Sequence, residues 1–246
     1  SGNVPETHVL RLHAADHVFQ NGGAGRVYAL LGFVQQREHA LGGGQHANTS
    51  AGDGRLTFAK PERENCDGYA YDPENPSQHI IDMSENEIEV PEDYTREELR
   101  QDLLCYTSPV LKEDLVLTGD MTAELYISSD APDTDFVVRV TDVDENGRSI
   151  KLADGLLSAR YRNGFARSEF LQEGEIVCLK IRTTKLSNCF RKGHRIRVTV
   201  TSSAKNFIFP NSNTREGFAS ARTVVAHNRV YHGGLHASRL TVRVEP

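Results

Sequence analysis

The chain has 246 residues, of which 38% are hydrophobic and 25% charged, and its formal net charge is −6. These proportions are ordinary for a folded globular protein and exclude global disorder. The negative net charge gives no general electrostatic reason to bind nucleic acid or an anionic membrane, and we expect neither partner. A chain of this length is long enough for one domain with additions.

The N-terminal residues SGNVPETHVL lack the basic and then apolar blocks of a signal peptide, and no apolar run approaches the length of a membrane span. Cys66, Cys105, Cys178 and Cys189 form no C-x-x-C pair, so reduced thiols are the default. We therefore expect a cytoplasmic protein, with a secreted origin left open.

The first half of the chain is predicted to be mostly loop with one helix. Residues 42–75 are rich in Gly, Asn, Asp and Pro, which predicts ordered loop with a few short strands. In DYTREELRQDLLCY, Thr95 and Glu98 have the spacing of a capping box. Leu99 and Leu103 lie one helical turn apart, so we predict a short helix that packs on an edge or end of the sheets.

From about residue 116 onward the hydrophobic pattern has the period of strands. MTAELYIS (121–128) alternates apolar and polar side chains, and FVVRVTDV (136–143) follows in the same style. The second segment ends at DENG (144–147), whose Asn-Gly pair can adopt the positive φ values of a tight hairpin.

A second hairpin is predicted from EIVCLKIRT (175–183) and HRIRVTVTSS (194–203), joined by the turn NCFRKG. In its return strand Ile196, Val198 and Val200 alternate with Arg195, Arg197, Thr199 and Thr201. This alternation predicts one apolar sheet face and one basic, solvated face. RTVVAHNRVYH (222–232) and SRLTVRVEP (238–246) read as the last strands, and the whole pattern predicts two packed antiparallel sheets.

The stretch SSDAPDTDF (128–136) carries three carboxylates, Asp130, Asp133 and Asp135, before an apolar strand. A Ca²⁺ ion would require several carboxylate and carbonyl oxygens from such a loop, which makes these residues candidate metal ligands. Aspartates in a turn also accept backbone N–H groups, and a partly buried one can pair with an arginine such as Arg139 or Arg160. We expect these acids to shape a bend, and we assign no metal.

Two further groups of side chains have both a functional and a structural interpretation. His227, His232 and His236 could meet on a hairpin as metal ligands, or simply lie in a terminal strand and turn. Lys180, Arg182, Arg195 and Arg197 could form a basic strip that docks a partner, although a solvated sheet face is the commoner explanation.

No motif of a catalytic centre is present. The sequence lacks the G-x-S-x-G nucleophile elbow of α/β-hydrolases, a P-loop, a G-x-G-x-x-G fingerprint and H-E-x-x-H. We therefore name no catalytic residue and no cofactor, and we predict that this chain alone catalyses nothing.

Five stretches of the sequence resemble, in the same order, the C-terminal domain of the cocaine-esterase-like and X-prolyl dipeptidyl-peptidase hydrolases. The resemblance covers roughly residues 40–246. Its segments are GQHANTSAGDGRLTF (44–58), DGYAYDPENP (67–76), residues 102–162 from DLLCYTSPV to SARYR, FRKGHRIRVTVTSS (190–203) and YHGGLHASRLTV (231–242).

Enzymes of that family join an α/β-hydrolase catalytic domain with a Ser-Asp-His triad to a helical cap and a C-terminal β jelly roll similar to galactose-binding domains. The resemblance implies that this chain is the jelly roll at 39–246, preceded by a poorly matched segment at 1–38 that packs on the sandwich. It implies an α/β-hydrolase partner in cis or in trans, and a homo-oligomer stays open.

The sequence departs from the family pattern after YDPENP, where a Gly pair is usual and SQHIIDMSENE stands instead. The resemblance implies that this loop faces the catalytic cleft. Ile80, Ile81 and Met83 are therefore candidate substrate contacts, and the alternative is an apolar loop that covers the core.

The predicted fold is an all-β antiparallel sandwich of jelly-roll type, with one short helix and long loops. The predicted function is that of an accessory domain of a serine hydrolase that cleaves dipeptides after X-Pro ends or hydrolyses acyl esters or amides. The alternative is a stand-alone module that binds carbohydrate or another protein.

Overall fold

The computed structural model describes residues 30–33, 46–57, 62–80, 92–119 and 121–242. Three short 3₁₀ turns are present in these ranges, namely η1 (Glu97–Leu99), η2 (Ala159–Tyr161) and η3 (Gly217–Ala219). The strands are β1 (Leu30–Phe33), β2 (Leu56–Thr57), β3 (Asn65–Tyr71), β4 (Leu103–Thr107), β5 (Leu115–Gly119), β6 (Met121–Ser129), β7 (Asp135–Val143), β8 (Ser149–Ser158), β9 (Val177–Arg182), β10 (Leu186–Phe190), β11 (Arg195–Thr201), β12 (Ala226–His232) and β13 (Arg239–Val242).

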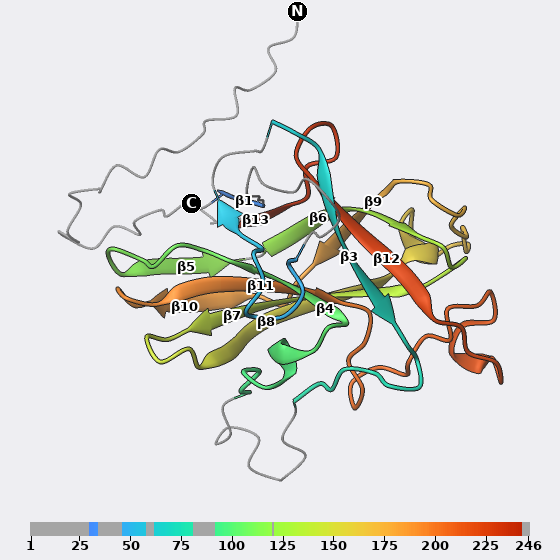
Figure 1. Cartoon of the computed structure of the whole chain (residues 1–246), viewed down its shortest axis with the longest axis horizontal. Coiled ribbons are helices and arrows are strands. Elements are labelled where there is room, and N and C mark those ends of the chain that lie inside the picture. The colour runs from blue at the N-terminus through green and yellow to red at the C-terminus, as the bar shows by residue number, and fades with distance from the viewer. Residues whose placement is uncertain (1–29, 34–45, 58–61, 81–91, 120, 243–246) are drawn as a thin grey trace, which may run out of the picture.

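The strands form two main antiparallel sheets and a two-stranded pair. One sheet has the order β2-β1-β13-β6-β12-β3, with β9 on the other edge of β6, and the second has the order β4-β11-β7-β8. β5 and β10 form the separate pair. Figure 1 shows the first sheet in the upper part of the view and the second sheet in the lower part. This arrangement confirms the predicted all-β antiparallel sandwich.

The core lies between the inner faces of the two sheets. In β6 the side chains of Met121, Ala123, Leu125 and Ile127 are fully buried and alternate with half-buried polar ones, as the period of two predicts. The facing sheet contributes apolar side chains from β4, β7 and β11 to the same hydrophobic cluster. Burial of this cluster is the main force that holds the sheets together.

The predicted turn at DENG joins β7 and β8 and is confirmed. Gly147 has a φ of +84°, a conformation that favours glycine. The Asp144 side chain accepts the backbone N–H groups of Asn146 and Arg148, at 2.8 and 2.9 Å. The Asp144 carboxylate therefore stabilises the turn.

The second predicted hairpin is wrong. β9 pairs with β6, whereas β11 lies between β4 and β7 in the other sheet. Residues of the expected turn belong instead to β10, which pairs with β5. Residues 188–190 are the end of β10, and burial of Phe190 in the core stabilises them as a strand.

The predicted basic and solvated face of β11 is also wrong. Arg197, Thr199 and Thr201 are buried. Residues 92–101 cover this face of the sheet through Glu98, which binds Arg197, and the next residue, Asp102, accepts the Thr201 hydroxyl with its carbonyl. We call residues 92–101 the covering segment. Lys180 and Arg182 lie on β9 in the other sheet, so the four basic residues form no continuous strip.

The predicted helix is reduced to the single turn η1. Leu103 begins β4 and is buried, whereas Leu99 is 61% exposed, so the two leucines do not share a helix face. Thr95 does not cap the turn: its hydroxyl donates to Asp93 and accepts the Ser149 N–H. In the described part of the chain no helix is long and apolar enough to cross a membrane.

The N-terminal part of the chain contributes to the sandwich through β1. β1 lies within the segment 1–38 and pairs with β13 and β2. Residues 42–75, expected to be loop with short strands, contain β2 and the longer β3 in their described part. The domain boundary at residue 38 stays a prediction.

Candidate functional site

The loop between β6 and β7 places one of its three carboxylates at the centre of a buried polar cluster. Asp133 is 0% exposed. Its Oδ2 accepts Arg160 Nε and Asn211 Nδ2, both at 2.7 Å, and its Oδ1 accepts the Arg160 backbone N–H at 2.9 Å. The three hydrogen bonds hold the Asp133 carboxylate firmly, since a hydrogen bond to a charged acceptor is stronger than one between neutral groups.

Arg160 also binds the loop between β11 and β12. Its Nη1 donates to the carbonyl of Arg215 and its Nη2 to the carbonyl of Thr214, both at 3.0 Å. Gly217 has a φ of +63°, and a Cβ there would lie 3.1 Å from Arg160 Nη2. The Asp133–Arg160 pair therefore fixes the loop after η2 and the loop between β11 and β12 to the start of β7.

Of the other two acids in this stretch, Asp135 shares Asn211 with Asp133, whereas Asp130 has a partner of its own. Asp135 accepts Asn211 Nδ2 at 2.9 Å, and burial raises the pKa of its carboxyl. Asp130 pairs on the surface with His227, whose Nδ1 lies 2.7 Å from Asp130 Oδ2. The cluster has the form expected for a structural bend, and of the two arginines considered as partners it is Arg160 that pairs with a buried aspartate. No group of three or more His, Cys, Asp or Glu side chains placed to hold a metal occurs among the described residues.

The three histidines considered as metal ligands also lie apart. His232 is buried, with its Nε2 at 2.9 Å from Asp67 Oδ2. His236 pairs with Glu64, and His227 with Asp130 as described above. Each ring therefore has its own carboxylate partner.

Exposed phenylalanines occur on the two loops that meet at Arg160. Phe165 and Phe209 are each 79% exposed and Phe218 is 74% exposed, and the rings of Phe209 and Phe218 stack with centroids 5.9 Å apart. In Figure 1 the loop at 162–176 lies at the upper right, and the later part of the loop at 202–225 lies at the lower right. We call Phe165, Phe207, Phe209 and Phe218 the aromatic end.

Phe170 connects the aromatic end to the polar cluster beneath it. The guanidinium carbons of Arg160 and Arg215 lie 5.1 and 4.6 Å from its ring centroid. These cation–π contacts hold the loop in place, and Phe165 packs on Tyr161 with ring centroids 5.4 Å apart while most of its surface stays exposed. Exposed aromatic side chains in such a group are typical of an interaction site, because a monomer gains nothing by leaving them in water.

Ile80, one of the three candidate substrate contacts, lies beside the aromatic end. Its segment runs parallel to residues 204–207, with the His79 N–H donating to the Lys205 carbonyl at 2.7 Å. The His79 ring stacks on Phe207 with centroids 4.7 Å apart. Ile80 is half-buried and donates its N–H to the Tyr94 hydroxyl at 2.9 Å. Ile81 and Met83 lie outside the described residues.

A mainly apolar hollow of about 290 Å³ adjoins Phe207 on the same side. Val137, Leu156 and Phe207 are its apolar lining, and Asp154, Gly155 and residues 182–184 complete it. Gly155 is required there, because a Cβ would lie 2.4 Å from the Arg182 carbonyl oxygen. The hollow and the aromatic end together give this part of the surface a shape that an apolar partner can fill.

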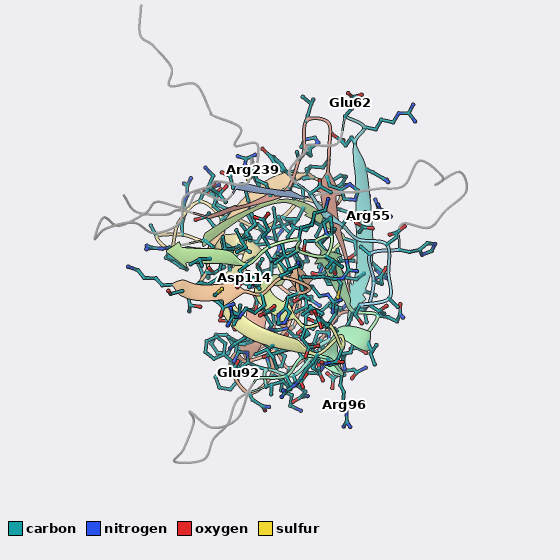
Figure 2. All side chains as sticks on the ribbon, turned by 90° about the vertical axis from the view of Figure 1, so that its left-hand side faces the viewer. Arg55, Glu62, Glu92, Arg96, Asp114 and Arg239 are labelled. Carbon is teal, nitrogen blue, oxygen red and sulfur yellow. The ribbon has the colours of Figure 1, made fainter. Side chains whose placement is uncertain are left out.

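The covering segment buries a second ionic cluster, which the sequence patterns did not indicate. Glu98 forms an ion pair with Arg197, and its Oε1 accepts the Ser149 hydroxyl at 2.8 Å. Tyr94 lies over the guanidinium of Arg139, with 3.8 Å between the Arg139 Cζ and the ring centroid. Figure 2 shows that Glu92 and Arg96 of this segment lie at the lower edge of the molecule, opposite Glu62 and Arg239.

The environment of His79 makes stability depend on pH. Burial, followed by the nearby Lys151 charge, lowers the pKa of His79 below its usual range. Below about pH 6.5 the unfolded chain therefore binds a proton that the folded chain resists, so stability falls as the pH decreases, by up to about 1.4 kcal/mol per pH unit. We expect His79→Gln to remove this contribution. Urea unfolding at pH 7 and pH 5.5 measures it.

The exposed His227→Gln provides the control for this experiment, since its ring is 68% exposed. Its unfolding free energy should follow the wild-type pH dependence. A His79→Gln variant that loses stability with acidification as steeply as the wild type would show that another group carries the effect.

Comparison with known proteins finds the same region in larger hydrolases. Residues 15–241 match the family model described as the X-Pro dipeptidyl-peptidase C-terminal non-catalytic domain, so the match extends into the segment 1–38. The cocaine esterase of Rhodococcus sp. (strain MB1 Bresler) is 36% identical over 211 residues, which cover 83% of this chain and 36% of the esterase.

Solved structures agree with this match. An aminopeptidase from a marine sediment Thaumarchaeota archaeon superposes with a TM-score of 0.73 and 25% identity, over 79% of this chain and 35% of the aminopeptidase. An α-amino acid ester hydrolase superposes with a TM-score of 0.70 and 22% identity, over 78% of this chain and 34% of the hydrolase, and shares the fold. The chain thus spans about a third of the length of the proteins it matches.

Proposed function

The chain belongs to the family of X-Pro dipeptidyl-peptidase C-terminal non-catalytic domains, and from this premise we propose that it serves as the accessory β-domain of a cytoplasmic serine hydrolase. The nucleophile, its base and the oxyanion hole belong to an α/β-hydrolase partner joined to it in cis. That partner hydrolyses an acyl ester or amide, or releases dipeptides after X-Pro ends. This chain needs no cofactor for its part.

The observation that carries this proposal is the aromatic end. A side chain as large as Phe gains about 1.5–3 kcal/mol when it moves from water into an apolar contact. Phe209 and Phe218 are already stacked on loops that are fixed by buried charges, so little conformational entropy is lost when they dock. These are the properties of a preformed docking surface for a partner domain.

The position of Ile80 suggests how the accessory domain would act on catalysis. If the aromatic end docks on the catalytic domain, Ile80 lies close to the same partner, since the neighbouring His79 stacks on Phe207. We propose that Ile80, Ile81 and Met83 form part of the wall of the substrate cleft. The domain would thus restrict which acyl or leaving groups the partner accepts.

A chimera tests the proposal. In it, the region of the Rhodococcus cocaine esterase that matches this chain is replaced by this chain. We expect the chimera to hydrolyse a p-nitrophenyl ester, and the double variant Phe209→Ser, Phe218→Ser to lose about 2–4 kcal/mol of domain association, because central aromatic contacts dominate such interfaces. Activity and the melting temperature of the chimera measure this loss.

The matched control is Leu235→Ser, which removes an apolar side chain that is 86% exposed in the loop between β12 and β13. It should leave the chimera unchanged. The isolated chain should give no turnover of the ester or of an X-Pro-p-nitroanilide, and no adduct with a serine-directed phosphonate. A double variant as active and as stable as the parent chimera would refute the docking surface, and an adduct on the isolated chain would refute the accessory role.

A further inference from the structure

Arg139, in the middle of β7, is the most unusual buried group in the described residues. Its side chain is 1% exposed. Its Nε, Nη1 and Nη2 atoms are all buried, and within the described part of the chain none of them has a hydrogen-bond partner. Native proteins rarely bury polar atoms in this state, and each such case calls for a specific explanation.

The Tyr94 ring explains one face of this guanidinium but not its edges. The ring lies over the Arg139 Cζ at 3.8 Å and so contacts the flat face of the group. The N–H bonds of a guanidinium lie in its plane and point away from such a ring. Tyr94 also carries no compensating negative charge, because burial raises the pKa of its phenol to about 12.

The neighbouring carboxylates are bound to other groups. Asp154 lies directly across from Arg139 on β8, but its Oδ2 is 3.3 Å from Lys151 Nζ and 3.7 Å from His79 Nδ1. Glu98 pairs with Arg197, and Glu92 pairs with Lys151. Among the described ion pairs none includes Arg139, so its charge has no direct partner.

A second unsatisfied group faces Arg139 from the other neighbouring strand. Thr199 is directly across from it on β11, so their side chains lie on the same face of the sheet. The Thr199 hydroxyl is fully buried and has no hydrogen-bond partner either. The guanidinium of Arg139 and the adjacent hydroxyl of Thr199 thus lie beneath the covering segment without hydrogen-bond partners.

We propose that Arg139 and Thr199 form a buried binding site for a small planar oxyanion of the carboxylate type, such as formate. The planar fork of a guanidinium matches two coplanar oxygens, and the threonine hydroxyl supplies a third donor. The anion neutralises the buried charge and satisfies the atoms that the protein leaves unpaired. This site is distinct from the docking surface, because neither Arg139 nor Thr199 belongs to the aromatic end or lines the hollow beside Phe207.

Because formate would bind only the folded state, the stability of the chain should depend on formate concentration in a defined way. Above the dissociation constant, each tenfold increase in formate should raise the folding equilibrium constant about tenfold. We therefore expect urea unfolding of the whole chain, at constant ionic strength, to show this rise with formate. Benzoate, which has the same charge and carboxylate but a bulky ring, should not produce it.

The variant Arg139→Met should abolish the response to formate. Arg96→Met is the matched control, because Arg96 is exposed on the same covering segment, as Figure 2 shows. It should retain the full response. An equal response in both variants, or no rise of wild-type stability with formate, would overturn the proposal.

A spectroscopic measurement keeps the test decisive if Arg139→Met does not fold. The Nε–H resonance of Arg139, labelled with ¹⁵N-arginine and assigned by its loss in Arg139→Lys, should shift on titration with formate. The other arginine Nε–H resonances serve as internal references for bulk salt effects. A resonance that stays unchanged over the titration would also overturn the proposal.

Discussion

Asp133→Asn is expected to lower the free energy of unfolding by about 3–5 kcal/mol, the usual cost of leaving a buried charge without its partner. Asp133 is completely buried, and Arg160 reaches it with both its Nε and its backbone N–H. The substitution keeps the volume of the side chain but places an amide against three donors. Urea unfolding of the isolated chain measures the loss.

Asp130→Asn is the matched control, since it lies in the same loop and also pairs with a basic side chain. Its partner His227 is largely exposed, so we expect a change of about 0–1 kcal/mol. The two variants have the same chemistry and differ in burial. If both lose similar amounts, the burial of the Asp133–Arg160 pair is not what holds the loops.

Glu98→Gln is the second substitution with a large expected effect, again about 3–5 kcal/mol. Glu98 pairs with the buried Arg197 and accepts the Ser149 hydroxyl, so it fixes the covering segment to β11 and β8. Without its charge, Arg197 stays buried and unpaired. Chemical unfolding measures the change, and hydrogen exchange at residues 92–101 should become faster, because the segment opens more often.

A double variant separates the contribution of the Glu98–Arg197 ion pair to stability from that of the other contacts of the covering segment. Glu98→Leu with Arg197→Met removes both charges and keeps apolar volume, which is often neutral for stability. We expect it to recover most of the stability that Glu98→Gln loses. Glu113→Gln, at an exposed position, should stay close to the wild type. A double variant less stable than Glu98→Gln would show that the covering segment needs the charges themselves.

The sequence predicted those parts of the fold in which local pattern and tertiary packing agree. β6 alternates because one face meets the core, and the turn at Asp144–Gly147 needs only local hydrogen bonds. A bend at the three aspartates was also predicted, with Arg139 or Arg160 as the partner of a buried one, and the structure shows the Asp133–Arg160 pair. At β6 and at the Asp144–Gly147 turn, the local sequence pattern therefore largely determines the structure.

The predictions failed where a distant segment changed the environment. Arg197 and Thr199 alternate with valines as if their face were solvated, but the covering segment lies nearly a hundred residues earlier in the chain and buries them. The same contact explains the lost helix, since Glu98 turns inward to Arg197 rather than back to Thr95. The pairing of a strand with a partner far along the chain cannot be read from its own alternation.

The aromatic end was missed for a similar reason. Phe165, Phe209 and Phe218 are scattered over two loops, and nothing in their spacing shows that they meet. A possible signal was the presence of isolated phenylalanines in segments otherwise rich in Gly, Asn, Ser and Arg. Such residues have no strand face to bury them, so contact with a partner is what would remove their rings from water.

The tandem pairing of β12 and β13 along one edge of β6 has a consequence for biosynthesis. Residues 121–124 pair with β13 and residues 126–129 with β12, so this edge is complete only when residue 242 has left the ribosome. Until then β6 presents an open edge of unpaired amide groups to other nascent chains. The domain must therefore fold largely after its translation, and the cell must keep more than a hundred synthesised residues from aggregating in the meantime.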